Sequence, residues 1–196
     1  MDPMQNAMGV ACARMLALAM LVFATRVSAA EYPLSGEFLH LRSQVTPGMA
    51  GIRLGATGDA LPEGDVSADP RVTGAVLEVL GDGVLGAGEP AVPLPGETWR
   101  ALGVPPGSRG FRYFDSSGRF GVQRVSLRFG TRVSLSIRGG GPGWPYQTSG
   151  MPRAVTVLLH IGDETFCTSF GTFKPRRSGA MCASHNPPPA TCRYDT

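Results

Sequence analysis

Lysine, histidine and cysteine are scarce in this chain of 196 residues, which contains one lysine, Lys174, three histidines and four cysteines. None of the histidines belongs to an HExxH motif and the cysteines form no CxxC, so the sequence offers no zinc site. No GxSxG nucleophile elbow is present, and no two carboxylates stand out as a glycosidase pair. We therefore predict no metal, no cofactor and no enzymatic activity.

Long apolar runs are also missing, because 27 glycines and 17 prolines interrupt the chain throughout its length. This pattern argues against long helices. The uncharged run at residues 15–25 is much shorter than the roughly 20 residues that a membrane-spanning helix needs. It follows Arg14 and precedes the small residues at 27–30, an arrangement typical of a secretory signal peptide. We therefore predict a signal peptide at residues 1–29, secretion to the extracellular or periplasmic space, and no membrane span.

Charge is divided unevenly along the sequence, although the formal net charge is only +3. Residues 57–90 contain seven acids and one arginine, whereas residues 109–138 contain seven arginines and one acid, Asp115. The small net charge predicts no nucleic-acid partner. The acids of the first stretch, among them Asp69, lack the spacing of a calcium-binding loop, so a solvated acidic loop is the simpler interpretation.

The segments between glycines and prolines are short, β-branched or aromatic, and often alternate between apolar and polar residues, as half-buried antiparallel strands do. Strands are expected at residues 36–42, 51–56, 74–80, 91–94, 110–114, 120–129, 132–138, 154–161 and 165–170. Their number and spacing predict an all-β fold, a two-layer antiparallel β-sandwich with few or no helices, formed as a single domain by residues 30–196. A jelly-roll and an immunoglobulin-like strand order both remain open.

The clearest predicted element is a hairpin that turns at Gly130 and Thr131. On both of its strands, valine, leucine, phenylalanine or isoleucine alternates with arginine or serine. Successive side chains of a strand point to opposite faces, so the apolar set faces the core and the arginines face solvent. A second hairpin turns at Gly162 and Asp163. Its first strand is apolar on both faces, which predicts a central strand covered on both sides.

The arginine face of the first hairpin is the sharpest candidate for a binding site. Its residues, together with an arginine of the preceding strand, are Arg112, Arg124, Arg128, Arg132 and Arg138. Guanidinium groups are planar donors that suit sulfate, phosphate and carboxylate, so an anionic glycan or another cell-envelope component is the expected partner. The simpler alternative is a solvated face, or one that the acidic residues 57–90 cover and neutralise.

Three segments carry a resemblance to a known family. Residues 99–113 contain a W-x-x-L-G motif followed by P-G-S-R-G-F, residues 167–171 contain a cysteine before a Phe-Gly turn, and residues 187–192 form a proline-rich end that closes in cysteine. They resemble an uncharacterised domain that is repeated in large secreted proteins of myxobacteria and related deltaproteobacteria. The resemblance implies a β-rich extracellular module without known activity, and a disulfide between Cys167 and Cys192.

Three cysteines remain beyond the predicted signal peptide, so one of them has no partner within the chain. Spacing alone leaves the pairing open. If Cys167 pairs with Cys192 as the resemblance implies, Cys182 is either a buried thiol or the partner of another molecule.

The sequence therefore predicts a secreted, non-enzymatic binding or structural module of unknown ligand and unknown oligomeric state. The alternative from another class is a hydrolase acting on an extracellular polysaccharide or a cell-envelope polymer. Its site would be assembled from loop residues whose convergence a linear sequence does not show.

Overall fold

The computed structural model describes residues 29–42, 50–61, 66–81, 84–85, 91–148, 151–175 and 180–192. The predicted signal peptide lies, except for Ala29, outside the described residues. No helix in the described part of the chain has the length and apolarity needed to cross a bilayer.

Most described residues belong to two β-sheets. The larger sheet contains β2 (Ser35–Arg42), β3 (Gly51–Gly58), β7 (Trp99–Ala101), β8 (Gly110–Phe114), β9 (Val122–Arg128), β10 (Val133–Gly140), β14 (Lys174–Pro175) and β15 (Ala180–Asn186). The smaller sheet contains β1 (Ala30–Pro33), β4 (Ala75–Gly81), β6 (Val92–Leu94), β12 (Ala154–Ile161) and β13 (Glu164–Gly171). The short strands β5 (Val84–Leu85) and β11 (Gln147–Thr148) pair separately, and the helical turns are α1 (Pro70–Thr73) and the 3-10 turn η1 (Gly96–Thr98).

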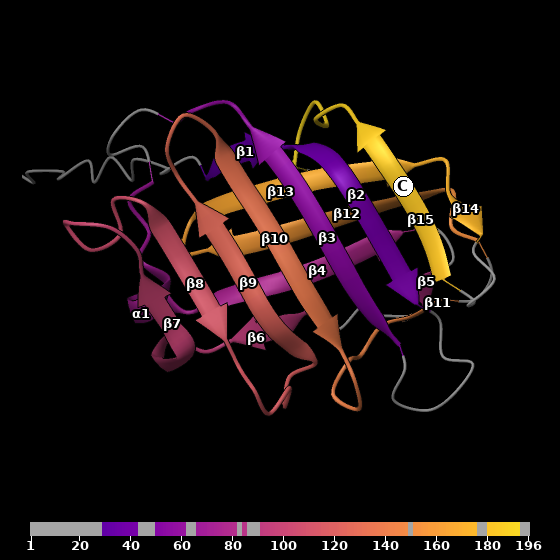
Figure 1. Ribbon diagram of the computed structural model, residues 1–196, viewed down its shortest axis with the longest axis horizontal. Coiled ribbons are helices and arrows are strands. Elements are labelled where there is room, and N and C mark those ends of the chain that lie inside the picture. The colour runs from indigo at the N-terminus through magenta and orange to yellow at the C-terminus, as the bar shows by residue number, and fades with distance from the viewer. Residues whose placement is uncertain are drawn as a thin grey trace, which may run out of the picture.

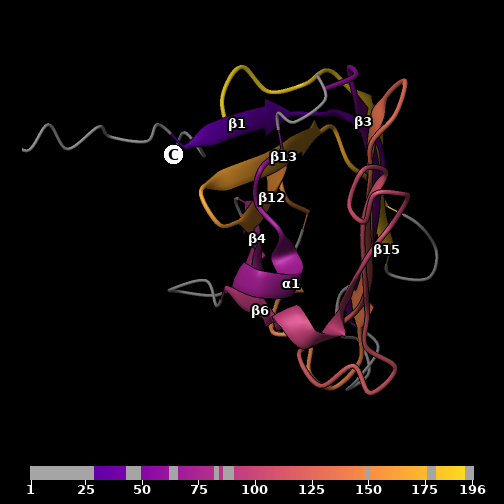
Figure 2. The ribbon, with the colours of Figure 1, turned by 90° about the vertical axis from the view of Figure 1, so that its left-hand side faces the viewer.

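The two sheets pack face to face, as Figure 1 shows from the side of the larger sheet and Figure 2 shows edge-on. The strand order is β14-β15-β2-β3-β10-β9-β8-β7 in the larger sheet and β1-β13-β12-β4-β6 in the smaller one. Neighbouring strands run antiparallel in both sheets except for β1, which runs parallel to β13. The predicted all-β, two-layer sandwich is confirmed.

All nine predicted strands are present, and their ends differ from the prediction by at most two residues. Among the strands that the sequence did not predict, β15 is the longest. Its sequence, AMCASHN, contains no β-branched or aromatic residue, so local propensity gives no strand signal. Pairing with the distant strand β2 stabilises β15 instead, with Met181 opposite Leu41 and Ala183 opposite Leu39.

The core lies between the sheets and contains the apolar side of the predicted arginine hairpin. Val125 and Leu127 of β9 are fully buried, and they face inward together with Leu135 and Ile137 of β10. The smaller sheet contributes Val155, Val157, Leu159, Phe166 and Phe170, all fully buried. Burial of these side chains is the main driving force for packing the two sheets together.

Cys192 packs against the outer side of the smaller sheet. The strand β12 lies between β13 and β4, and its outward residue Leu158 is buried with Cys167, Cys192 and Leu80. Cys167 and Cys192 form a disulfide with a Cα–Cα distance of 5.3 Å. The prediction that β12 is central and covered on both sides, and the pairing implied by the resemblance, are both confirmed. Cys182 is a free thiol that lies partly exposed on β15.

Removing the disulfide should lower the free energy of unfolding. The bridge closes a loop with a sequence separation of 25, which restricts the unfolded chain and stabilises the fold by about 3 kcal/mol. We expect that loss in the Cys167→Ser, Cys192→Ser double variant, measured by urea denaturation. The Cys182→Ser variant is the matched control and should unfold like the parent protein; an equal loss in both variants would contradict the assignment.

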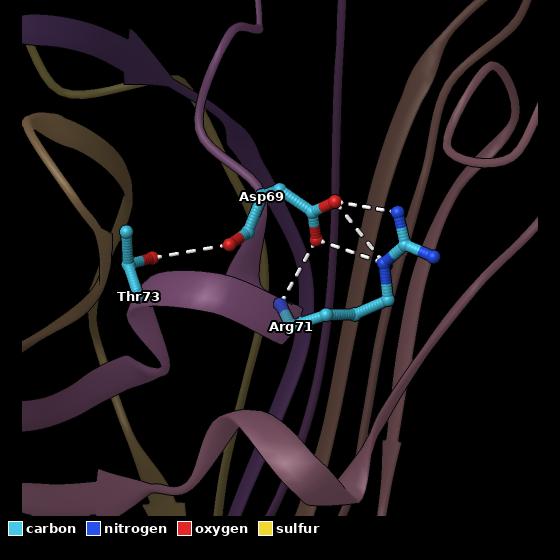
Figure 3. Close-up of polar contacts among 3 residues, drawn as sticks. All are labelled: Asp69, Arg71 and Thr73. Atoms are coloured by element: carbon cyan, nitrogen blue, oxygen red, sulfur yellow. Dashed lines mark hydrogen bonds and ion pairs between the residues drawn. The ribbon is translucent and has the colours of Figure 1, made fainter.

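The short helix α1 is capped at its start by Asp69. Figure 3 shows the Asp69 carboxylate accepting hydrogen bonds from the Arg71 backbone N–H at 2.9 Å and from its guanidinium, with Nη2 at 2.6 Å. The hydrogen bonds to the Arg71 side chain lower the pKa of Asp69 below its ordinary value. Both carboxylate oxygens are therefore engaged in capping the helix and pairing with Arg71.

This pair predicts a small stability difference that depends on pH. A carboxyl with a lowered pKa in the folded state contributes stability above its unfolded-state pKa of about 4, and the contribution disappears as the pH falls through the folded-state value. The Asp69→Asn variant should therefore melt slightly below the parent protein at pH 7 and level with it near pH 2. A melting difference that stays constant from pH 7 to pH 2 would contradict this origin.

Candidate functional site on the outer face of the large sheet

The predicted arginine face is real and belongs to the larger sheet. Arg124 and Arg128 of β9 and Arg138 of β10 are exposed, whereas Arg112 of β8 is half-buried. They alternate with inward-facing core residues, so all four point away from the smaller sheet. Figure 1 is viewed from this side, and no described element lies in front of the sheet there. Arg132 lies apart from them, in the connection between β9 and β10.

Strand register extends this face beyond the residues that the sequence indicated. Arg138 lies opposite Arg124 on one side and opposite Arg53 of β3 on the other. The exposed His40 of β2 lies opposite Arg53. Neighbouring strands are about 4.8 Å apart, so three arginines and a histidine form a row across four adjacent strands. We call Arg124, Arg138 and Arg53 the arginine row.

The arginine row works against the stability of the sheet. Like charges directly opposite each other on adjacent strands repel, and such pairs are destabilising. In the part of the chain that the structure describes, no carboxylate forms an ion pair with any of these three arginines. The guanidinium of Arg124 lies over the ring of Phe114, with its central carbon 5.8 Å from the ring centroid.

Asp115, the one acid of the basic stretch at residues 109–138, is engaged within its own loop. Asp115 follows β8 directly, and its carboxylate accepts hydrogen bonds from the Ser117 N–H at 2.8 Å, the Ser117 hydroxyl at 2.6 Å and the Arg119 N–H at 3.1 Å. The hydrogen bonds from Ser117 are the main reason that the pKa of Asp115 is lowered. This carboxylate therefore orders its own loop.

The acidic stretch at residues 57–90 was the other candidate for neutralising the face. Asp69 pairs with Arg71, and Glu78 lies on β4 of the smaller sheet, with Oε2 3.5 Å from His160 Nε2. These two acids therefore do not cover the arginine row, and a third, Asp59, lies beside Arg132 in a separate depression. The acids at positions 63, 65, 82 and 89 lie outside the described residues.

A β-bulge shapes the part of this face that lies on β2. Pairing between β2 and β3 shifts register between Gly36 and Phe38, because Gly36 lies opposite Ala56 and Phe38 opposite Gly55. The shift leaves Glu37 as an extra residue, and Glu37 and Phe38 are both exposed although they are consecutive. Bulges commonly re-aim side chains in this way near functional sites.

Three adjoining depressions hollow the face. The first, of about 250 Å³, is lined only by arginine and serine: Arg112, Arg124, Ser126, Arg128, Ser134 and Ser136. The second, of about 420 Å³, contains the arginine row, His40 and Phe38. The third, of about 740 Å³, contains Phe38, Glu37, Thr57, His185 and Asn186. Arg124 and Ser136 line both the first and the second, and Phe38 lines both the second and the third.

The described residues that line these depressions supply many hydrogen-bond donors and a single carboxylate. Glu37 is the one carboxylate among the described residues that line them, whereas glycoside hydrolysis in most families needs two. Among the described residues, no three histidine, cysteine or acidic side chains cluster as a metal site would require.

Arg132 lies in a separate depression beside Asp59. The structure therefore brings four of the five predicted arginines together on one face and adds Arg53 to them.

The sequence contained no local signal for Arg53, His40 or Phe38 as members of this site. They lie on β2 and β3, far before the hairpin in the sequence, and only the pairing of β3 with β10 brings them beside it. Comparisons with models of protein families, with curated proteins and with solved structures find no match to this chain. The site is therefore interpreted from its own residues.

Proposed function

We propose that this protein is a secreted, non-enzymatic binding module that holds an anionic glycan of a cell envelope or extracellular material on the outer face of its larger sheet. The observation that carries the proposal is the arginine row. Three arginines in direct register lower the stability of the sheet and have no acidic partner among the described residues. A bound anion would compensate all three charges.

The surroundings of the row support an anion rather than a solvated surface. Arginine donates in a planar fork that matches carboxylate and sulfate oxygens, and serine hydroxyls lie between the arginines in the first depression. The Ser126 hydroxyl is buried and has no hydrogen-bond partner among the described residues.

Two features support secretion. The Cys167–Cys192 disulfide is compatible with an oxidising compartment such as the periplasm or the cell exterior. The predicted signal peptide at residues 1–29 would direct the protein to the same compartments. The resemblance to a repeated extracellular β-module without known activity is compatible with secretion.

A hydrolase that acts on the same polymers is the alternative, and no particular observation favours it. The largest of the three depressions contains Glu37 alone among the carboxylates of the described residues. The Oε1 atom of Glu37 accepts a hydrogen bond from the Thr57 hydroxyl at 3.2 Å, and no second acid among the described residues lines that depression to act as a nucleophile or base.

The arginine row can be tested by neutralising two of its members. The Arg124→Ser, Arg138→Ser double variant should bind immobilised hyaluronan and polygalacturonate at least about tenfold more weakly than the parent, because two charge-assisted contacts are lost. Binding should weaken further at high salt. Biolayer interferometry measures both effects, with neutral dextran as the negative surface.

The matched control removes the same charge from elsewhere on the molecule. Arg71 and Arg153 are exposed and lie outside the arginine row, so the Arg71→Ser, Arg153→Ser variant should bind like the parent. The Arg124→Ser, Arg138→Ser variant should also unfold at the same temperature as the parent or at a higher one, because like charges that lie opposite each other are removed. Equal retention of both double variants on the acidic glycans would refute the proposed function.

A further inference from the structure

The exposed ring of Phe38 packs at a fixed position on the outer surface of the sheet. Phe38 is 40% exposed. A Cβ placed on Gly55, its partner across the strand pair, would lie 2.5, 3.0 and 3.1 Å from three consecutive carbons of that ring. The ring therefore lies over Gly55, which only a residue without a side chain permits. His40 holds it from the side, edge to face, at a centroid distance of 5.7 Å.

A ring held over the sheet in this way offers its outer face to a ligand. The C–H face of a pyranose ring is apolar and flat enough to pack on an aromatic ring, which then buries area with little loss of side-chain freedom. Covering Gly55 is one structural use for Phe38. It does not account for the bulge that brings Glu37 to the same surface beside the ring.

Polar groups surround the ring on its other side. Glu37 Oε1 accepts a hydrogen bond from the Thr57 hydroxyl, and Asn186 and His185 line the same depression. His185 has a φ of 55°, a left-handed conformation that is uncommon for residues other than glycine and that concentrates at functional sites. Carboxylate, amide and imidazole groups are hydrogen-bonding partners for sugar hydroxyls.

The charge of the surface changes sign between neighbouring depressions. Among the described residues, the depression of the arginine row contains no carboxylate, whereas the one beyond Phe38 contains Glu37 and no arginine. A polymer with a negative charge on every unit would place one of them beside Glu37, where like charges repel. A polymer in which an uncharged unit neighbours a charged one avoids this contact.

From these features, and resting on the proposed function, we infer that the depression at Phe38, Glu37 and Asn186 is a subsite for an uncharged sugar, adjacent to the arginine row that binds the acidic sugar. Phe38 stacks on the uncharged sugar, and Glu37 and Asn186 bind its hydroxyls. The preferred ligand is thus an acidic glycan in which charged and uncharged sugars alternate.

Three probes distinguish this ligand from other polyanions. Hyaluronan oligosaccharides carry a carboxylate on every second sugar, oligogalacturonates carry one on every sugar, and a single-stranded oligonucleotide carries a phosphate on every unit. With the number of charges matched, calorimetric titration should show hyaluronan bound about tenfold more tightly than the other two. Glu37→Gln should narrow this gap by improving the binding of oligogalacturonate.

Variants of Phe38 separate stacking from a purely structural role. Phe38→Ala should weaken hyaluronan binding about tenfold and leave oligogalacturonate binding unchanged. Phe38→Leu still covers Gly55 but has no aromatic face, so it should lose as much as Phe38→Ala. The matched control is Phe114→Ala, which removes the other exposed phenylalanine of this face from beneath Arg124 and should weaken both glycans equally.

The outcomes separate the two proposals. Equal binding of hyaluronan and oligogalacturonate, equal losses of both in Phe38→Ala, or full binding in Phe38→Leu would overturn the subsite while leaving glycan binding by the arginine row intact. Binding of the oligonucleotide with neither glycan bound would overturn both and assign the face to nucleic acid, whose bases also stack on aromatic rings. No binding of any probe would overturn both as well.

Discussion

Strand register in the larger sheet is the constraint on which both the core and the candidate site depend. Because side chains alternate between the two faces, a slip of one residue between β9 and β10 would bring Arg124 and Arg128 toward the core and Val125 and Leu127 to the surface. Burying unpaired guanidinium groups is prohibitively costly. The apolar inner face therefore fixes the positions of the arginines on the outer face.

The two faces contribute unequally to stability. The inner face buries a continuous set of apolar side chains against the smaller sheet. The Cys167–Cys192 disulfide, on the outer side of the smaller sheet, further stabilises the fold by restricting the unfolded chain. The outer face carries opposed like charges that weaken the pairing. Residues that reduce stability without contributing to packing are expected where a protein binds another molecule, which is why the arginine row, and not the core, indicates function.

The sequence predicted the parts of the molecule that are encoded locally. Alternation and the glycine and proline breaks located the strands from β2 to β13 that carry strong patterns, and they placed Arg124, Arg128 and Arg138 on one face. The strand β15 and the parallel strand β1 have weak local signals and form only through distant partners. Arg53 joins the site for the same reason, since nothing near it in the sequence shows that β3 pairs with β10.

The bulge in β2 is the least predictable feature and the one with the largest effect on the surface. A regular strand would alternate Glu37 and Phe38 between core and solvent, and the phenylalanine or the carboxylate would be buried. One extra residue between two pairs, Gly36–Ala56 and Phe38–Gly55, keeps Leu39 in the core while both preceding side chains reach solvent. The sheet thereby gains an aromatic ring and a carboxylate beside the arginine row, and with them a surface whose charge changes over a single strand. Such a gradient distinguishes among polyanions, which a uniformly basic sheet would bind alike.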